Sequence, residues 1–259
     1  MLWQSWNEVP ELTSRYDTLE RVIALRYGAD TQAMVFVLYE ELLALRTALL
    51  THPYSVVLTA RIATLREQIQ HLYDESPFPE LPGVAVETVR TEPLILEYSR
   101  HVFDLKYASA ARAIRSQVVV VADPDIEPLW SGSPYMFVID DSRTLRVWNR
   151  PFQFSDLVFG RNRATVDGIP VAHPMLVPDR LRIMAAGEII FVGHRKPRSV
   201  IVNTKSGHFR PPPVTADVIR EVCREVLGLP DHHIDVFTLA PTATRHSTPT
   251  AASMPRKAQ

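Results

Sequence analysis

The residues most capable of chemistry form one short segment that directly follows the apolar run at residues 200–202: Lys205, Ser206, Gly207 and His208. The segment offers a cation, a hydroxyl and an imidazole that can give or take a proton. Three prolines, residues 211–213, hold the exit extended, and we expect Gly207 to supply a turn with positive φ. An imidazole held at a strand end is a candidate catalytic or ligand-binding group. The alternative is a hairpin end whose histidine caps backbone groups.

A second histidine, His173, is followed by Pro174, which predicts an extended backbone at His173. Alone, this residue is typical of a structural histidine. Paired with His208, it completes a general base and general acid for phosphodiester or glycosyl transfer.

Glu188 follows Ala-Ala-Gly on a predicted strand, where it is either an exposed carboxylate or part of a polar cavity at the sheet centre. With His173 and His208 it would supply ligand types that suit zinc or iron. No local spacing supports such a metal site, so we expect chemistry without a metal ion. His232 and His233 are adjacent and point to opposite sides of a turn, which argues against joint chelation.

An arginine-rich loop at residues 149–163 contains Arg161 and Arg163 beside phenylalanines. These side chains can hold a phosphate through bidentate contacts, or a base by stacking. The alternative is an ordered surface loop anchored by its aromatic residues. In the catalytic interpretation, Arg163 or Lys205 stabilises developing negative charge.

The elements that position these residues begin with helices. Asp17 is a candidate cap for a helix ending at Gly28, and Thr31 is a candidate cap for the next. Apolar residues then repeat at helical spacing over residues 31–50 and 56–73, which predicts a helical hairpin or small bundle. Residues 94–115 also show a helical pattern.

The pattern of apolar residues changes from helical to strand-like spacing after residue 116. A β-branched run at 117–122 precedes two predicted hairpins, one at 135–148 and one at 182–203. A helix that Thr215 caps and Gly228 closes leads to a last strand at 234–239.

Segregated helices and strands predict an α+β fold, in which an N-terminal helical bundle precedes an antiparallel β-rich domain with one C-terminal helix. We expect a helical region at 1–116, the α+β domain with the site at 117–239, and a disordered tail at 240–259.

Composition is that of an ordinary globular protein: 259 residues, 46% apolar, 22% charged, with a net charge of −1. This charge gives no global attraction to nucleic acid or anionic membrane. The single cysteine, Cys223, excludes internal disulfides and is expected to be a buried inert thiol. No signal peptide or membrane span is recognised, which predicts a cytoplasmic protein. The strongly apolar stripe at 34–50 suggests a homodimer through the N-terminal helices.

Residues 133–237 resemble the C-terminal part of the plant IQ-motif-containing calmodulin-binding proteins. The likeness rests on His173, on Ala-Ala-Gly at 185–187, and on a Ser-Gly-His-aromatic-x-Pro segment at 206–211. Pro174 and Met175 replace two serines of that pattern, and Glu188 stands where those proteins are not acidic. No IQ motif is present, so calmodulin binding is not implied. The resemblance implies a shared site that includes both histidines, without naming a reaction.

Two functions follow from the sequence. The first is a metal-independent transferase or hydrolase for a phosphorylated or nucleotide-like small molecule, with His208 as base, His173 as acid, and Ser206 and Glu188 beside them. The second is a non-catalytic binding module that uses its helical half to contact a partner. The sequence identifies no cofactor. The sequence contains no glycine-rich phosphate loop of either common type, and its nine glycines leave little room for one.

Overall fold

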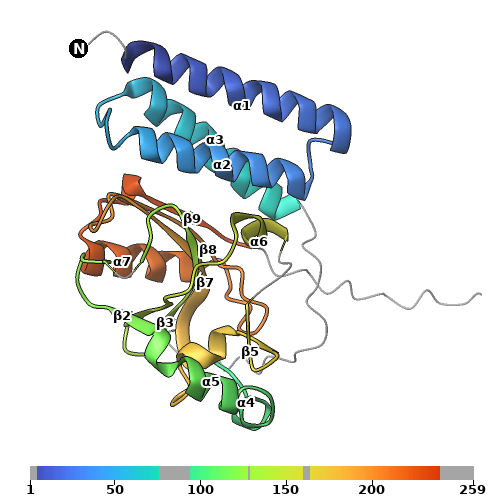
Figure 1. Ribbon diagram of the computed structural model, residues 1–259, viewed down its shortest axis with the longest axis vertical. Coiled ribbons are helices and arrows are strands. Elements are labelled where there is room, and N and C mark those ends of the chain that lie inside the picture. The colour runs from blue at the N-terminus through green and yellow to red at the C-terminus, as the bar shows by residue number, and fades with distance from the viewer. Residues whose placement is uncertain (1–4, 76–93, 128, 160–163, 240–259) are drawn as a thin grey trace, which may run out of the picture.

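A computed structural model of the protein describes residues 5–75, 94–127, 129–159 and 164–239. Three long helices form a layer above a central sheet, and shorter helices surround the rest of the sheet (Figure 1). This arrangement confirms the α+β fold class. The residues expected to form the tail, 240–259, lie outside the described ranges. No helix in those ranges is long and apolar enough to cross a membrane.

The upper layer consists of α1 (Ser5–Tyr27), α2 (Gln32–Ala48) and α3 (Val56–Glu75). As predicted, Thr31 caps α2, because its side chain accepts a hydrogen bond from the Met34 amide at 3.3 Å. α1 starts well before Asp17, so that carboxylate lies inside the helix instead of capping it. The apolar stripe of α2 is buried within the chain, among α1, α3 and the sheet. The reason for expecting a homodimer through this stripe is therefore absent.

The main sheet has the strand order β2-β4-β3-β7-β8-β9, and β1 also pairs with β7. Both predicted hairpins are present as antiparallel pairs, β3 with β4 and β7 with β8. A small separate sheet pairs β5 with β6. The strand bounds are β1 Leu96–Glu97, β2 Val118–Val121, β3 Pro134–Asp140, β4 Leu145–Trp148, β5 Thr165–Val166, β6 Ile169–Pro170, β7 Arg182–Val192, β8 Ser199–Asn203 and β9 Ile234–Phe237.

The last strand departs from the antiparallel expectation. β9 runs parallel to β8, because α7 (Thr215–Leu227) makes a crossover between them. Gly228 ends α7 in the left-handed conformation with φ 66°, as the sequence predicted. Thr215 is the first residue of α7 instead of its cap, and its hydroxyl donates to the Pro212 carbonyl at 2.8 Å. The sheet is thus mixed and mostly antiparallel.

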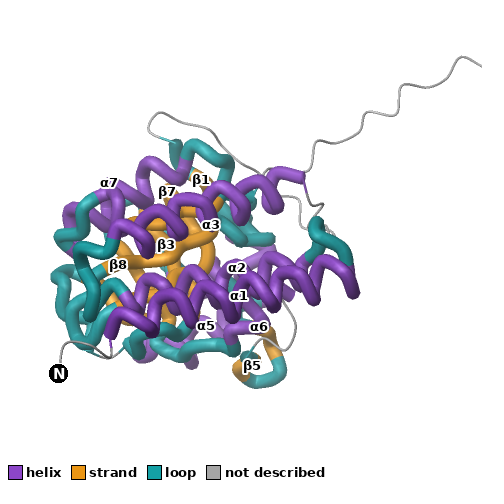
Figure 2. The backbone as a smooth tube through the Cα atoms, turned by 90° about the horizontal axis from the view of Figure 1, so that it is seen from above, coloured by secondary structure: helices purple, strands orange, loops and turns teal. Residues whose placement is uncertain are grey.

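The two faces of the sheet are covered differently. α7 packs on one face, where the buried thiol of Cys223 joins the core and burial raises its pKa to about 12. On the other face, α2 and α3 cover one end, and Figure 2 shows β3, β7 and β8 beneath these helices. The remaining helices and turns are α4 Arg100–Lys106, α5 Ala108–Ile114, α6 Phe154–Phe159, η1 Arg115–Gln117, η2 His173–Leu176 and η3 Asp231–His233.

Residues 94–116 differ from the predicted continuous helix. β1 pairs with β7, and α4 and α5 then pack with η2 on the end of the sheet that α2 and α3 leave open. Ser99 starts α4 as its cap, accepting from the Val102 amide at 3.4 Å, and Tyr107 interrupts the helix with φ −125°. These residues therefore pack with the sheet, whereas the sequence had placed them in the helical region at 1–116.

Candidate functional site

His208 lies in a tight turn that follows the end of β8. The Arg210 amide donates to the Ser206 carbonyl at 2.7 Å, and the Phe209 amide donates to the Ser206 hydroxyl at 3.4 Å. The residue with positive φ is Arg210, at 47°, and not Gly207 as expected. Phe209 is buried in the core, which anchors the turn and leaves the adjacent imidazole of His208 partly exposed. Ser206 thus shapes the turn.

His173 is the first residue of η2 instead of an extended residue. Pro174 is tolerated because the first turn of a helix needs no amide donor at that position. The imidazole is fully buried, at 0% exposure, and Nε2 donates to the Gly187 carbonyl at 3.0 Å. Among the described strands, β8 pairs with β7 only from Glu188 onward. At Gly187, where β7 no longer pairs with β8, the side chain of His173 supplies a hydrogen bond to the backbone of β7.

The two imidazoles converge, with ring centroids 6.4 Å apart. The hydroxyl of Tyr107, at the junction of α4 and α5, lies 3.1 Å from Nε2 of His208, and the two rings meet edge to face at 5.6 Å. Tyr98 also stands edge to face with His208, at 6.0 Å. Four chain segments therefore meet at one cluster, which we call the His–Tyr cluster: Tyr98, Tyr107, His173 and His208.

Burial determines the protonation of both tyrosines. Burial, and then the neighbouring Tyr107, raise the pKa of Tyr98 to about 12. Burial also raises the pKa of Tyr107, although the neighbouring Tyr98 lowers it in part. Both hydroxyls therefore keep their protons at neutral pH, and Tyr107 is available as a donor to His208.

Glu188 is buried at 1% exposure, so the interpretation as an exposed strand carboxylate is wrong. It accepts from the Asn203 side chain at 3.1 Å. Burial raises the pKa of Tyr39 and of Tyr73, whose hydroxyls are 3.0 Å apart, and Glu188 adds a smaller contribution in the same direction. Glu188 thus takes part in a buried polar group that links β7 and β8 to α2 and α3.

Lys205 was expected to bind a substrate beside the histidines, but its ammonium makes structural contacts instead. Its ammonium donates to the carbonyls of Leu157 at 3.0 Å and Val158 at 3.1 Å, near the end of α6. A lysine at a helix C-terminus satisfies carbonyls that lack helical partners. Arg161 and Arg163, the predicted phosphate-binding residues, lie outside the described ranges.

Sequence reasoning missed Tyr98 and Tyr107. Tyr107 stands four residues after Phe103, and this spacing puts two aromatic side chains on one helical face. That signal indicates packing and does not point to a histidine 101 positions away in the chain. In the described part of the chain, no group of three or more His, Cys, Asp or Glu side chains is placed to hold a metal ion.

No family model, curated protein or solved structure matches this chain. Any assignment of function therefore depends on the geometry of the His–Tyr cluster.

Proposed function

We propose that the protein is an enzyme that uses His208 as its acid–base group, without a metal ion, on a phosphorylated or nucleotide-like small molecule. The observation that carries this proposal is the convergence of His173 and His208 at 6.4 Å, with Tyr107 3.1 Å from Nε2 of His208. A partly exposed imidazole with an ordered hydrogen-bond partner is the arrangement that proton transfer to a substrate requires.

The roles of the two histidines differ from those expected. His208 is partly exposed and can meet a substrate, whereas His173 is fully buried and donates to the Gly187 carbonyl. We therefore assign proton transfer to His208 and a positioning role to His173. The substrate class rests on the sequence, in which Arg161 and Arg163 are the groups suited to a phosphate. The same two histidines carry the resemblance to the IQ-motif-containing proteins, which we retain as part of the proposal.

A thermal-shift screen with nucleotides, NAD and sugar phosphates tests this function, followed by a turnover assay on any ligand that raises Tm. We expect a ligand that stabilises the wild type and is turned over, with turnover lost in His208→Ala. The matched control is His194→Ala, which removes an exposed imidazole elsewhere and should keep full turnover. Equal turnover in His208→Ala and the wild type would refute the acid–base role.

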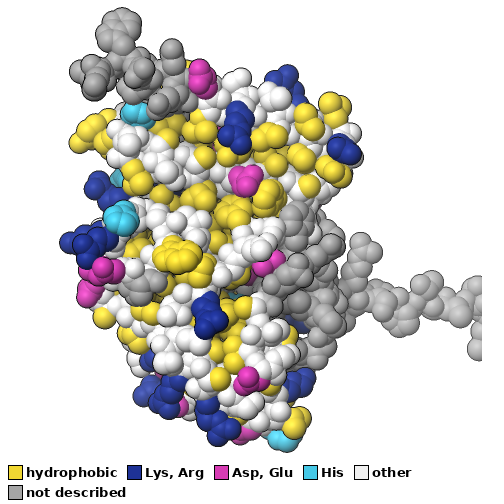
Figure 3. All heavy atoms as spheres, in the orientation of Figure 1, with side chains coloured by type: hydrophobic (Ala, Val, Ile, Leu, Met, Phe, Trp, Pro, Cys, Tyr) yellow, Lys and Arg dark blue, Asp and Glu magenta, His cyan; other side chains and the backbone are white. Residues whose placement is uncertain are grey.

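The alternative function is a non-catalytic module that binds a partner through the helical layer. It is favoured by large apolar side chains that this layer exposes, including Leu25 at 89%, Tyr54 at 94% and Val56 at 80%. Figure 3 shows hydrophobic side chains spread over this part of the molecule. Under this alternative, no ligand in the screen shifts Tm. His208→Ala then costs only the stability of its hydrogen bond to Tyr107, about 1 kcal/mol.

A further inference from the structure

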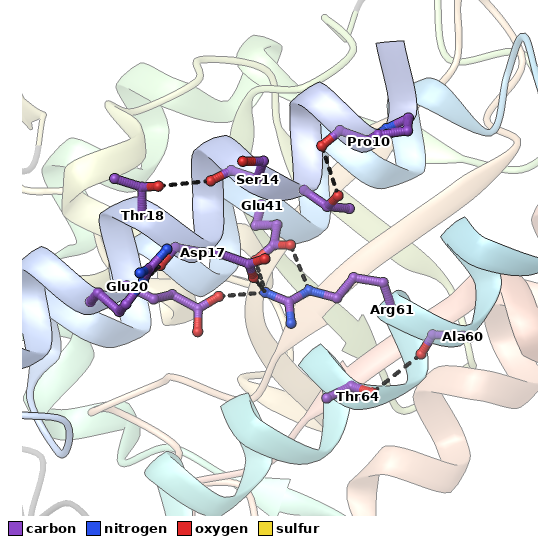
Figure 4. A network of polar contacts seen from close by, with 11 residues as sticks. Pro10, Ser14, Asp17, Thr18, Glu20, Glu41, Ala60, Arg61 and Thr64 are labelled. Carbon is purple, nitrogen blue, oxygen red and sulfur yellow. Dashed lines mark hydrogen bonds and ion pairs between the residues drawn. The ribbon is translucent and has the colours of Figure 1, made fainter. Parts of the chain in front are cut away.

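One guanidinium joins the three long helices. Arg61 of α3 donates through Nε and Nη2 to both oxygens of Glu41 on α2, at 2.7 and 3.0 Å. The same Nη2 lies 2.6 Å from Glu20 and 3.2 Å from Asp17, both on α1 (Figure 4). We call these four residues the Arg61 cluster. It is a polar attachment between α1 and the α2–α3 pair.

The cluster is unbalanced in charge. Three carboxylates surround one guanidinium, and they differ in exposure: Glu41 is 0% exposed, Glu20 19% and Asp17 54%. Two buried or half-buried carboxylates that share one cation repel each other, and a proton on one of them removes that repulsion. Because Glu41 receives two bonds from Arg61, the proton belongs on Glu20.

We propose that α1 is a pH-controlled latch, held on α2 and α3 by a proton in the Arg61 cluster and loosened when that proton is lost. The groups that act on Glu20 within the described residues are Asp17 on its own helix, Glu41 on α2 and Arg61 on α3. Burial, and then the hydrogen bond with Glu41, raise the pKa of Glu20 from 4.5 to about 7. The latch therefore responds near neutral pH.

The direction of the response follows from linkage. A carboxyl group whose pKa is higher when docked binds more protons in the docked state. Its contribution to docking is complete below pH 4.5 and is lost as the pH rises through about 7. The shift corresponds to docking that weakens about tenfold between pH 6 and pH 8.

Loosening of α1 would uncover apolar surface. Leu12, Ile23 and Ala24 of α1 pack against the core that α2 and α3 share with the sheet. The facing side chains of α2 and α3 would then be open to water or to a partner. The latch thus controls, through pH, how much of this apolar face the protein presents.

Hydrogen exchange of the full-length protein, measured by mass spectrometry at pH 6 and pH 8, tests the latch. Protection factors, corrected for the intrinsic effect of pH, are compared for peptides of α1, with peptides of β7 as the internal reference. We expect protection of α1 to fall about tenfold at pH 8. In Glu20→Gln, which keeps the hydrogen bonds and cannot ionise, it should be equal at both values. Glu11→Gln, an exposed carboxylate on the same helix, should behave as the wild type.

Protection of α1 that does not depend on pH in the wild type would overturn the proposal. So would a pH dependence that survives in Glu20→Gln. If Glu20→Gln fails to fold, the carboxyl carbon of Glu20 in the wild type is titrated by NMR. A midpoint near 7 supports the latch, and a midpoint near 4.5 refutes it.

Discussion

The hydroxyl of Tyr107 lies 3.1 Å from Nε2 of His208, and this contact bears on which ring nitrogen carries the proton. The raised pKa of Tyr107 keeps its hydroxyl protonated, and we expect this hydroxyl to donate to Nε2 of the neutral imidazole. The proton of neutral His208 then resides on Nδ1. In that tautomer the lone pair that can take a proton is on Nε2, so a proton from a substrate would reach His208 through the Tyr107 hydroxyl, which passes its own proton to Nε2 and takes the substrate's in return.

Substitution of Tyr107 by Phe tests this assignment without reference to any activity. In the wild type at pH 8, nitrogen NMR should show Nδ1 of His208 protonated. In Tyr107→Phe the proton should shift toward Nε2, because the donor that occupied Nε2 is gone. Tyr98→Phe keeps the Tyr107 contact and should leave the tautomer unchanged. Protonated Nε2 in the wild type would contradict the assignment.

At the residue scale, sequence patterns located the two histidines but not their surroundings. His208 was recognisable because strand, turn and prolines are adjacent in the chain. Tyr107 approaches from a segment that contacts the turn only after the chain has folded, so no local pattern encodes it. Similarly, Lys205 looked available for an anion, but its ammonium satisfies carbonyls of α6, an element 47 positions away.

At the scale of elements, the helical layer is tied to the sheet by a buried ion pair. Asp235 of β9 receives two bonds from Arg46 of α2, at 2.8 and 2.6 Å, and Arg66 of α3 lies 3.2 Å away. Asp235 is 0% exposed and Arg46 is 3% exposed. Such a pair is strongly coupled to folding, because removal of one partner leaves a buried charge without compensation.

We therefore expect Asp235→Ala to lower the free energy of unfolding by about 3–5 kcal/mol, measured by urea denaturation. The control is Glu225→Ala, which removes one carboxylate from Arg143 in an exposed pair. That change should stay within about 0.5 kcal/mol, since solvent screens surface pairs. Similar losses in the two variants would mean that the buried pair does not tie the helices to the sheet.

The elements with strong periodic patterns, the long helices and the two hairpins, were predictable from sequence. Residues 94–116 were not, because their small and helix-forming residues conceal a short strand and a break at Tyr107. The parallel pairing of β9 with β8 was also missed. A crossover helix gives a parallel pair only when the following strand lies beside the preceding one, and the short pattern at 234–239 does not say which strand it pairs with.

At the scale of the whole molecule, the helical layer and the sheet share one core. Ile190, Val192, Ile201 and Phe237 of the strands are buried in the same cluster as the apolar residues of α2 and α3. Neither layer can separate without exposing this surface to water, at a cost of roughly 25 cal/mol per Å². The molecule should therefore unfold in one cooperative transition.

Two probes of the full-length protein can report the two layers separately. Far-ultraviolet circular dichroism follows mainly the long helices. Fluorescence of Trp148, buried in β4, follows the sheet in a background where the other three of the four tryptophans are Phe. Ile201→Ala should lower the free energy of unfolding by about 2–5 kcal/mol through the cavity it leaves. Both probes should shift to the same new midpoint, because the cavity lies in the shared core. A shift in the sheet signal alone would show that the helices fold independently, and the ion pair at Asp235 would then join two separate units.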